Sequence, residues 1–175
     1  MVKYAEILKH NTSLTSSSPT AVFVGATNGI GLGALRAFTK HTQSPTIYIV
    51  GRNAAALDRL LASLTTLNPS AKLIPIPAPD LTLVATATRA AHAIAATNPA
   101  HIDLLVLSPG YLSLRRDESP EGLDRVQAIR FYARMAFVTG LLPLLRAAPA
   151  PRVVSVLAGG KEGRLDGADL LLERG

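Results

Sequence analysis

The sequence predicts an α/β fold built on a doubly wound parallel sheet of about five strands. Short, fully apolar runs alternate with longer segments of helical periodicity, which is typical of parallel strands covered on both faces. A glycine-rich turn joins the first apolar run directly to a helical segment. Right-handed crossovers then favour the strand order 3-2-1-4-5, with the first strand beside the point where the order reverses.

The first twenty residues are expected to form a separate N-terminal segment. A short helix at 3–10 is followed by a polar linker at 11–20, which Pro19 interrupts. The folded domain is expected to span residues 21–175, opening with a buried strand at 21–24 and, after the glycine turn, a helix at 32–40.

The remaining elements alternate between strand and helix. Strands are expected at 46–50, 72–76, 102–107 and 152–157, and helices at 53–67, 82–97 and 121–146. Pro75 lacks a backbone N–H and therefore favours an edge position for its strand. Asn53 is the expected N-cap of the helix at 53–67, and Asp80 or Thr82 that of the helix at 82–97.

The helix at 121–146 is expected to begin at a capping cluster. Ser119 is the predicted N-cap and Pro120 the first helical residue, with acidic side chains nearby. Pro143 is expected to kink or shorten this helix. Arg130 lies on its apolar stripe, so the guanidinium either faces a polar cleft or cofactor or extends past the helix edge to solvent. The stripe consists of Leu123, Val126, Ala133, Phe137, Leu141 and Leu144.

Composition excludes several classes of protein. With 175 residues, 48% of them hydrophobic, the chain is long and apolar enough for one domain with its own core. The absence of cysteine excludes a disulfide scaffold, a Cys-ligated zinc site and a thiol nucleophile. The four histidines have no ligand spacing with a carboxylate or with each other, so no metal site is expected.

Charge and hydropathy favour a cytoplasmic protein without nucleic-acid or membrane partners. The net charge is +6, but the arginines are scattered and form no dense basic run interleaved with aromatics. No apolar run approaches the ~18 residues of a membrane-spanning helix. Lys3 and Lys9 are not followed by the apolar region of a secretory signal.

The turn after the first strand is the motif that indicates a phosphate-binding function. It reads Gly25-Ala26-Thr27-Asn28-Gly29-Ile30-Gly31, with the spacing G-x-x-x-G-x-G between a strand and a helix. Glycine lets the backbone approach a pyrophosphate, and the N–H groups at the start of the helix favour its negative charge. We therefore expect Gly25, Thr27, Asn28, Gly29, Ile30 and Gly31 to bind a dinucleotide. The alternative is a tight turn whose glycines serve packing alone.

Residues 20–160 resemble the short-chain dehydrogenase/reductase family. The turn matches the family's T-G-x-x-x-G-I-G, with Val24 in place of threonine. The segment E-G-L-D-R-V-Q-A-I-R-F-Y-A-R-M, followed by L-L-P-L-L, is similar to filamentous-fungal members, several of which belong to polyketide or terpenoid biosynthetic clusters. The resemblance implies a Rossmann-like fold, truncated after the fifth strand. It also implies cofactor contacts from Asp80 and Leu81 at the adenine and from Ser108 and Gly110 after the fourth strand.

The end of the second strand indicates which cofactor is bound. An acidic residue there would bind a ribose 2′-hydroxyl, whereas an arginine pairs with a 2′-phosphate. The chain has Arg52 and Asn53 at this point and no carboxylate nearby. Because a guanidinium matches a phosphate bidentately, NADP is preferred over NAD. The alternative for Arg52 is a solvated loop charge.

The family's catalytic residues are missing from this sequence. None of the four tyrosines opens a Y-x-x-x-K motif. By alignment, the catalytic serine of the family falls on Ala158, its tyrosine near Leu171, and the asparagine of its tetrad on Arg130. The catalytic residues are therefore unknown. The chain is either a fragment of a longer protein or a member of a lineage that lost the tetrad and kept the nucleotide fold.

Two functions remain open at this point. The first is an NADP-dependent oxidoreductase that acts on a carbonyl or alcohol, in polyketide or terpenoid secondary metabolism, with an unknown small-molecule substrate. The second is a catalytically inactive nucleotide-binding or partner-binding remnant. Because no sixth strand follows the strand at 152–157, its open apolar edge predicts self-association.

Overall fold

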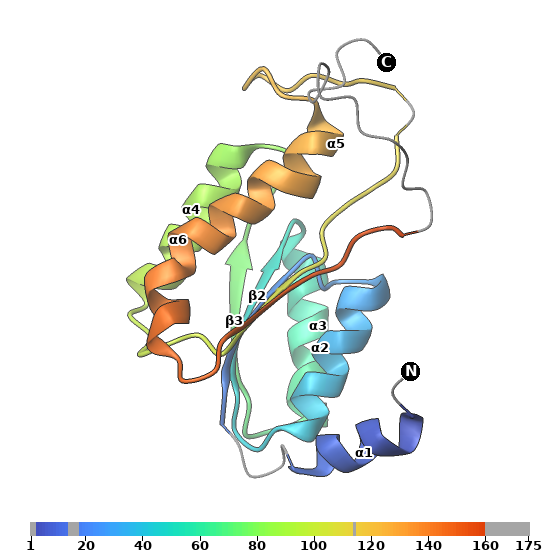
Figure 1. Ribbon diagram of the computed structural model, residues 1–175, viewed down its shortest axis with the longest axis vertical. Helices are drawn as coiled ribbons and strands as arrows, with labels where there is room; N and C mark the ends of the chain where they lie inside the picture. Colours follow the sequence, from blue (N-terminus) through green and yellow to red (C-terminus); the bar gives the residue numbers. More distant parts are fainter. Residues whose placement is uncertain (1–2, 14–17, 114, 160–175) are drawn as a thin grey trace.

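Five parallel strands form a single sheet at the centre of the computed structural model, which describes residues 3–13, 18–113 and 115–159 (Figure 1). The strand order is β3-β2-β1-β4-β5, which confirms the predicted order. The strands are β1 (Thr20–Val24), β2 (Thr46–Gly51), β3 (Lys72–Pro77), β4 (Leu104–Leu107) and β5 (Arg152–Ser155). β4 begins at Leu104 rather than at 102, and β5 ends at Ser155 rather than at 157, because pairing between the two strands runs only from Leu104 and Arg152 to Leu107 and Ser155.

Helices cover both faces of the sheet. Figure 1 shows α2 and α3 on one side and α4 and α6 on the other, with α1 below the sheet. Their bounds are α1 (Tyr4–Ser13), α2 (Gly29–His41), α3 (Ala54–Leu67), α4 (Val84–Ala96), α5 (Arg125–Gln127), the π-helix η2 (Ala128–Tyr132) and α6 (Ala133–Ala147). This three-layer arrangement is the doubly wound fold that the alternating pattern predicts.

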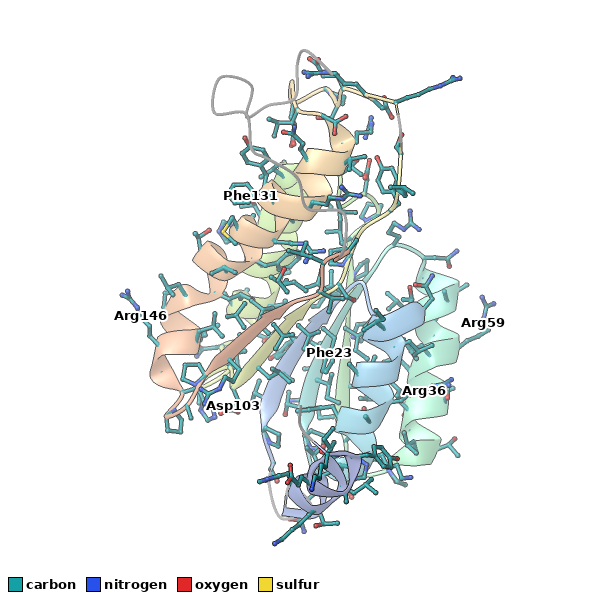
Figure 2. All side chains as sticks on the ribbon, turned by 45° about the vertical axis from the view of Figure 1, so that its right-hand side comes forward. Phe23, Arg36, Arg59, Asp103, Phe131 and Arg146 are labelled. Atoms are coloured by element: carbon teal, nitrogen blue, oxygen red, sulfur yellow. The ribbon has the colours of Figure 1, made fainter. Side chains whose placement is uncertain are left out.

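The core divides into two clusters, one on each face of the sheet. Because successive strand residues point to opposite faces, Val22 and Val24 pack with α4 and α6, while Ala21 and Phe23 pack with α2 and α3. Phe23 is enclosed between sheet and helices (Figure 2), and its ring centroid lies 5.5 Å from that of Phe38. The central strand is therefore buried on both sides.

The two edges of the sheet differ in how they are protected. Pro75 lies in the edge strand β3, as predicted. Its nitrogen faces away from β2, so its missing N–H costs the sheet no hydrogen bond. At the opposite edge, all four residues of β5 are exposed, and Val153 and Val154 are 45% and 46% exposed. These two valines point to opposite faces of the sheet, so neither face of β5 is well covered.

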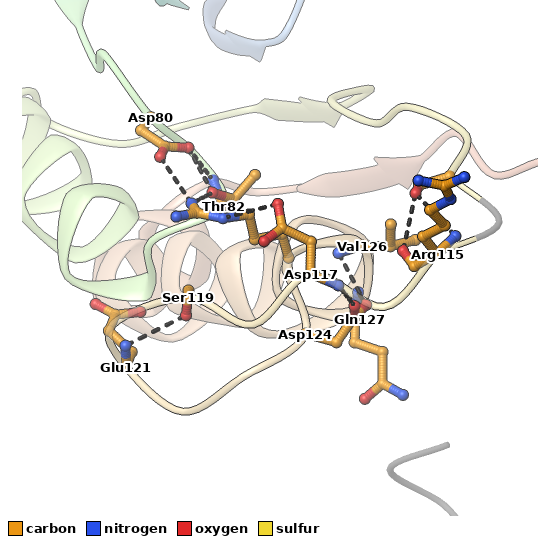
Figure 3. Close-up of polar contacts among 11 residues, drawn as sticks. Asp80, Thr82, Arg115, Asp117, Ser119, Glu121, Asp124, Val126 and Gln127 are labelled. Atoms are coloured by element: carbon orange, nitrogen blue, oxygen red, sulfur yellow. Dashed lines mark hydrogen bonds and ion pairs between the residues drawn. The ribbon is translucent and has the colours of Figure 1, made fainter. Parts of the chain in front are cut away.

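The long helix begins later than the sequence predicts. Its first residue is Arg125, and its N-cap is Asp124, whose carboxylate accepts hydrogen bonds from the N–H groups of Val126 and Gln127 at 3.0 Å each (Figure 3). Ser119 is not the cap; its N–H donates instead to the Leu123 carbonyl at 2.8 Å. Gly122 explains the difference, because its φ of +74° interrupts a right-handed helix. Pro120 therefore precedes the helix rather than opening it.

The helix then passes through one turn of π-helix, which changes the face that each residue presents. A π turn holds one residue more than an α turn and rotates all later residues about the helix axis. Arg130, expected on the apolar stripe, is exposed, and its Nη2 donates to the Tyr111 carbonyl at 3.3 Å. Of the two alternatives for Arg130, the structure supports the extended, solvent-facing one. Arg134 turns inward and is 4% exposed.

Beyond the π turn, the helix continues through Pro143 to Ala147, so Pro143 does not shorten it. By length and composition, the 23-residue helical segment Arg125–Ala147 is apolar enough to cross a membrane. Its inner face, however, contributes Phe137 and Leu141 to the core cluster shared with α4. Core packing accounts for the apolar character of this inner face.

The first turn of α4 is capped by a residue 37 positions away in the chain. The Glu121 carboxylate accepts hydrogen bonds from the N–H groups of Val84 at 2.7 Å and Ala85 at 2.9 Å. Asp80 and Thr82 do not cap this helix, contrary to the prediction, because the Asp80 carboxylate accepts from the N–H and hydroxyl of Thr82 in a local turn. The helix then begins at Val84, beyond that turn.

Replacing Glu121 with alanine should lower the free energy of unfolding by about 1 kcal/mol, because two N–H groups at a helix start lose a charged acceptor. Urea denaturation of the variant and wild type measures the loss. Glu118→Ala is the matched control, since Glu118 is exposed and its carboxylate, among the described residues, forms a surface ion pair with Arg116 rather than a helix cap. Equal losses in the two variants would contradict a capping role for Glu121.

Candidate functional site

A cleft lies at the carboxyl ends of the strands, where a doubly wound sheet binds its ligands. It consists of two adjoining pockets of about 430 Å³ and 160 Å³, both lined by Arg52 and Tyr111. The larger pocket is also lined by Pro79, Asp80, Thr82 and Arg125. The smaller is also lined by Gly25, Thr27, Asn28, Val50, Gly51, Leu81, Ser108, Pro109, Gly110 and Ile129. The folded chain thus brings most of the predicted binding residues to one place.

Two glycines of the turn allow it to pack against the segment after β4. Gly25 has a φ of +78°, and a Cβ there would lie 2.7 Å from the Pro109 nitrogen. A Cβ on Gly31 would overlap the Ser108 hydroxyl, which donates to the Gly25 carbonyl at 3.2 Å. Gly25 and Gly31 therefore have a packing role in the folded chain, whether or not the turn also binds a dinucleotide.

Gly29 differs from the other two glycines, because it borders open space. Its φ is +56°, and no atom lies within 4 Å of the position that its Cβ would occupy. Asn28, the N-cap of α2, makes no side-chain capping hydrogen bond, and Ile30 is 71% exposed at the first turn. An uncapped helix start beside an open cleft is suited to an anionic group. Gly29, Ile30 and Gly31 flank the pockets, whereas Thr27 and Asn28 line one.

Arg52, directly after β2, is an exposed side chain at the junction of the two pockets. Within the described ranges its guanidinium has no hydrogen-bond or ion-pair partner, so it is available to a ligand. Asn53 has a different role, since its Oδ1 accepts from the Ala56 N–H at 3.0 Å and caps α3 as predicted. Asn53 lines neither pocket.

Asp80 belongs to an ion network that the sequence did not reveal. Arg125 Nη1 lies 3.2 Å from the Asp80 carboxylate and donates to the Thr82 hydroxyl at 2.7 Å, while its Nε lies 3.3 Å from Asp117 (Figure 3). Burial raises the pKa of Asp80, but the Thr82 hydrogen bonds and the Arg125 charge outweigh it and hold that pKa below its ordinary value. The Asp80 carboxylate is therefore ionised and already occupied by protein donors.

Tyr111 is a second residue that sequence reasoning did not place in the cofactor site. It lines both pockets and is 41% exposed. Burial, followed by the nearby charges of Asp117 and Asp124, raises the pKa of its phenol above the ordinary value. Its position directly after the Ser108-Pro109-Gly110 segment was the available signal, because that segment follows a strand at the switch point.

The residues present fit a phosphorylated dinucleotide. The uncapped helix start and the open space at Gly29 suit a pyrophosphate. Arg52, which has no partner in the described part of the chain, suits a further phosphate beyond the end of β2. Leu81 supplies an apolar wall to the smaller pocket. The structure supplies no comparable catalytic set: Ala158 is exposed where the family's serine aligns, and Leu171 lies outside the described residues.

Several curated fungal proteins are similar to this chain in sequence. An oxidoreductase from Emericella nidulans is 42% identical over 155 residues, which cover 88% of this chain and 46% of the relative. An NmrA-like family domain-containing oxidoreductase from an Aspergillus species is 39% identical over 175 residues, covering 97% of this chain and 52% of the relative. A short-chain dehydrogenase/reductase from Stachybotrys chartarum is 32% identical over 160 residues, 83% of this chain and 45% of the relative. The chain thus spans about half the length of these relatives.

Solved structures share the same fold. The NADP active-site complex of RhlG from Pseudomonas aeruginosa matches with a TM-score of 0.63 and 25% identity, over 81% of this chain and 56% of that one. L-sorbose reductase from Gluconobacter frateurii, complexed with NADPH and L-sorbose, matches with a TM-score of 0.68 and 20% identity, over 81% and 53%. No family model matches the chain. The glycine turn, the strand order and these similarities together show that the chain has the Rossmann-like fold of short-chain dehydrogenases/reductases and is similar to fungal oxidoreductases, one of which is named as a member of that family.

Proposed function

We propose that this chain binds NADP(H) in the cleft, in preference to NAD(H), and belongs to an oxidoreductase that acts on a carbonyl or alcohol. The observation that carries the proposal is the position of Arg52, unpaired within the described residues and lining both pockets. A guanidinium there suits the ribose 2′-phosphate of NADP(H), a group that NAD(H) lacks. The two solved NADP(H) complexes of the same fold support this choice.

Each cofactor-binding residue has a distinct part in the proposal. Gly25 and Gly31 hold the turn against the loop after β4, and Gly29 leaves room for the pyrophosphate. Thr27, Asn28 and the exposed Ile30 would border the phosphates at the start of α2. A larger group forms the walls of the cleft around the rest of the dinucleotide: Arg52, Asp80, Leu81, Ser108, Gly110 and Tyr111.

The chemistry of such a site is hydride transfer between the nicotinamide ring and a substrate carbon. The protein contributes orientation, exclusion of water and a proton donor or acceptor. Secondary metabolism of polyketide or terpenoid type is part of the proposal, supported by the fungal origin of the curated relatives and by the resemblance of the segment from Glu121 to Met135. A cytoplasmic site of action belongs to the same proposal.

A second candidate function is a nucleotide-binding or partner-binding module without catalytic activity. The absence of a Y-x-x-x-K motif from the sequence favours it, because no tyrosine and lysine pair can then exchange the substrate proton. A nucleotide-binding module shares dinucleotide binding in the cleft with the enzyme and differs from it only in turnover, whereas a partner-binding module requires neither.

Calorimetric titration with NADPH and NADH tests the shared part, and turnover of a panel of polyketide and terpenoid ketones tests the difference. We expect NADPH to bind more tightly than NADH and turnover by the 175-residue chain to be weak or absent. Failure of both dinucleotides to bind would overturn the proposal. Robust, pH-dependent turnover would favour the enzyme over the inactive module and would indicate another proton donor, with Tyr111 as the first candidate.

We further propose that two copies of this chain associate through the β5 edge, where Val153 and Val154 are both exposed. Light scattering at micromolar concentration should give a mass above that of the monomer, and Val153→Lys should return it to the monomer value. Leu67→Lys, which changes a 41% exposed side chain at the end of α3, is the control and should leave the mass unchanged. A monodisperse wild-type monomer would indicate that other parts of the protein cover this edge.

A further inference from the structure

Arg134, in the first turn of α6, is a buried cation that has no carboxylate partner among the described residues. The residue is 4% exposed. In the described part of the chain, its guanidinium donates only to uncharged oxygens: to the Leu107 and Pro109 carbonyls at 3.1 Å and 2.7 Å, to the Ser155 hydroxyl, and to the Ile129 carbonyl at 3.4 Å. Buried charges in proteins are normally paired with an opposite charge. No opposite charge among the described residues therefore neutralises Arg134, and its positive potential acts on the groups around it.

Its surroundings are the wall of the cleft on the β4–β5 side. Pro109 and Ile129, which receive hydrogen bonds from Arg134, also line the smaller pocket. Arg52 and Asp80 follow β2 and β3, on the other side of β1. The cleft thus has a cation behind its wall at the end opposite the proposed 2′-phosphate site.

The charge of Arg134 is retained at neutral pH. Burial lowers the pKa of its guanidinium, and the neighbouring cation Arg130 lowers it further. An arginine nevertheless remains protonated under these conditions. Four of its N–H groups are held by the protein, so the side chain cannot turn away to solvent.

We propose that Arg134 biases the site toward the reduced, uncharged nicotinamide ring over the oxidised, positively charged one. The inference rests on the proposed function, because a dinucleotide with its 2′-phosphate at Arg52 extends its nicotinamide half over β4 and β5. The oxidised and reduced cofactors carry the same phosphates and differ in the charge of this ring. A fixed cation behind the wall therefore disfavours the oxidised form alone.

The test is the ratio of the dissociation constants of NADP+ and NADPH, measured by calorimetry. In the wild type this ratio should exceed one. Two unit charges about 10 Å apart at an effective dielectric constant near 20 change an equilibrium roughly tenfold, so Arg134→Gln should lower the ratio by about that factor. Arg146→Gln, at an exposed arginine of the same helix (Figure 2), is the control and should leave it unchanged. A purely structural role would weaken both cofactors equally.

Arg134→Lys provides a second measurement. It keeps a cation at this position, so the test does not depend on whether the uncharged Arg134→Gln variant folds. Burial lowers the pKa of a lysine below its ordinary value, so the charge at this position becomes titratable. The ratio should then stay near the wild-type value at pH 7 and fall as the pH rises to 9.5, while the wild-type ratio stays constant. This pH range lies above the titration of the 2′-phosphate.

The outcomes separate this inference from the proposed function. If neither cofactor binds the wild type, the proposed function fails. If both bind and the wild-type ratio is one or less, or if the ratio in Arg134→Lys is independent of pH, the role of Arg134 is overturned while NADP(H) binding stands.

Discussion

Replacing Arg52 with aspartate is expected to weaken NADPH binding about a hundredfold and to leave NADH binding nearly unchanged. A hydrogen-bonded charge pair contributes about 1.5–3 kcal/mol, and a carboxylate at the same place adds repulsion toward the 2′-phosphate. A loss of about 3 kcal/mol corresponds to roughly a hundredfold in affinity. The aspartate also offers an acceptor to the ribose 2′-hydroxyl of NADH. The preference between the two cofactors should therefore reverse.

Titration of both cofactors into wild type and variant measures this reversal. Arg59→Asp is the matched control, because Arg59 is an exposed arginine on α3 that lines neither pocket (Figure 2). It introduces the same change of charge seven residues further along the chain. If the cofactor ratio is the same in the Arg52 variant as in the wild type, the solvated-loop interpretation of Arg52 is the correct one.

Replacing Gly31 with alanine should cost about 2–3 kcal/mol of folding free energy, near the upper end for an overpacked core position. The added Cβ would overlap the Ser108 hydroxyl and lie 3.0 Å from the Ala26 Cα and 3.1 Å from the Gly25 carbonyl oxygen. Because two of these contacts are backbone atoms, the turn itself must shift. The same shift should weaken dinucleotide binding.

Gly33→Ala, in the same helix, should have the opposite sign. No atom lies within 4 Å of its added Cβ, and alanine favours a helix interior by up to ~1 kcal/mol over glycine. Urea denaturation of both variants gives the two changes. Ser108→Ala in the Gly31→Ala background should restore part of the lost stability. Two glycine variants with equal effects would show that the turn does not require the contact with Ser108.

The strand order and the layers could be predicted because they follow from local features. Apolar strands such as 21–24 alternate with amphipathic helices, and connection handedness restricts how they assemble. The cap of α3 by Asn53 is equally local, since its acceptor lies three residues from the donor. Features of this kind depend on residues adjacent in the sequence.

Other features could not be predicted, because they depend on contacts between distant residues or on backbone conformation. The cap of α4 comes from Glu121, 37 residues away, and Asp80 is held by Arg125, 45 residues away. The late start of the long helix depends on the positive φ of Gly122. An uninterrupted α-helix puts Arg130 on the apolar stripe, whereas the chain makes a π turn there and Arg130 is exposed.

That π turn also affects how residues are matched between this chain and the short-chain dehydrogenases/reductases that it resembles. A π turn is equivalent to one residue inserted into an α-helix, so an alignment without a gap to a helix that is α throughout pairs residues that face different directions beyond the turn. Arg130, which aligns with the family's asparagine, lies inside the turn. Removing one residue from Ala128–Tyr132 would rotate α6 by about 100° relative to α5 and turn Arg134 out of the interior. Residue equivalences along this helix therefore have to be established by superposition of the cleft rather than by position in the alignment.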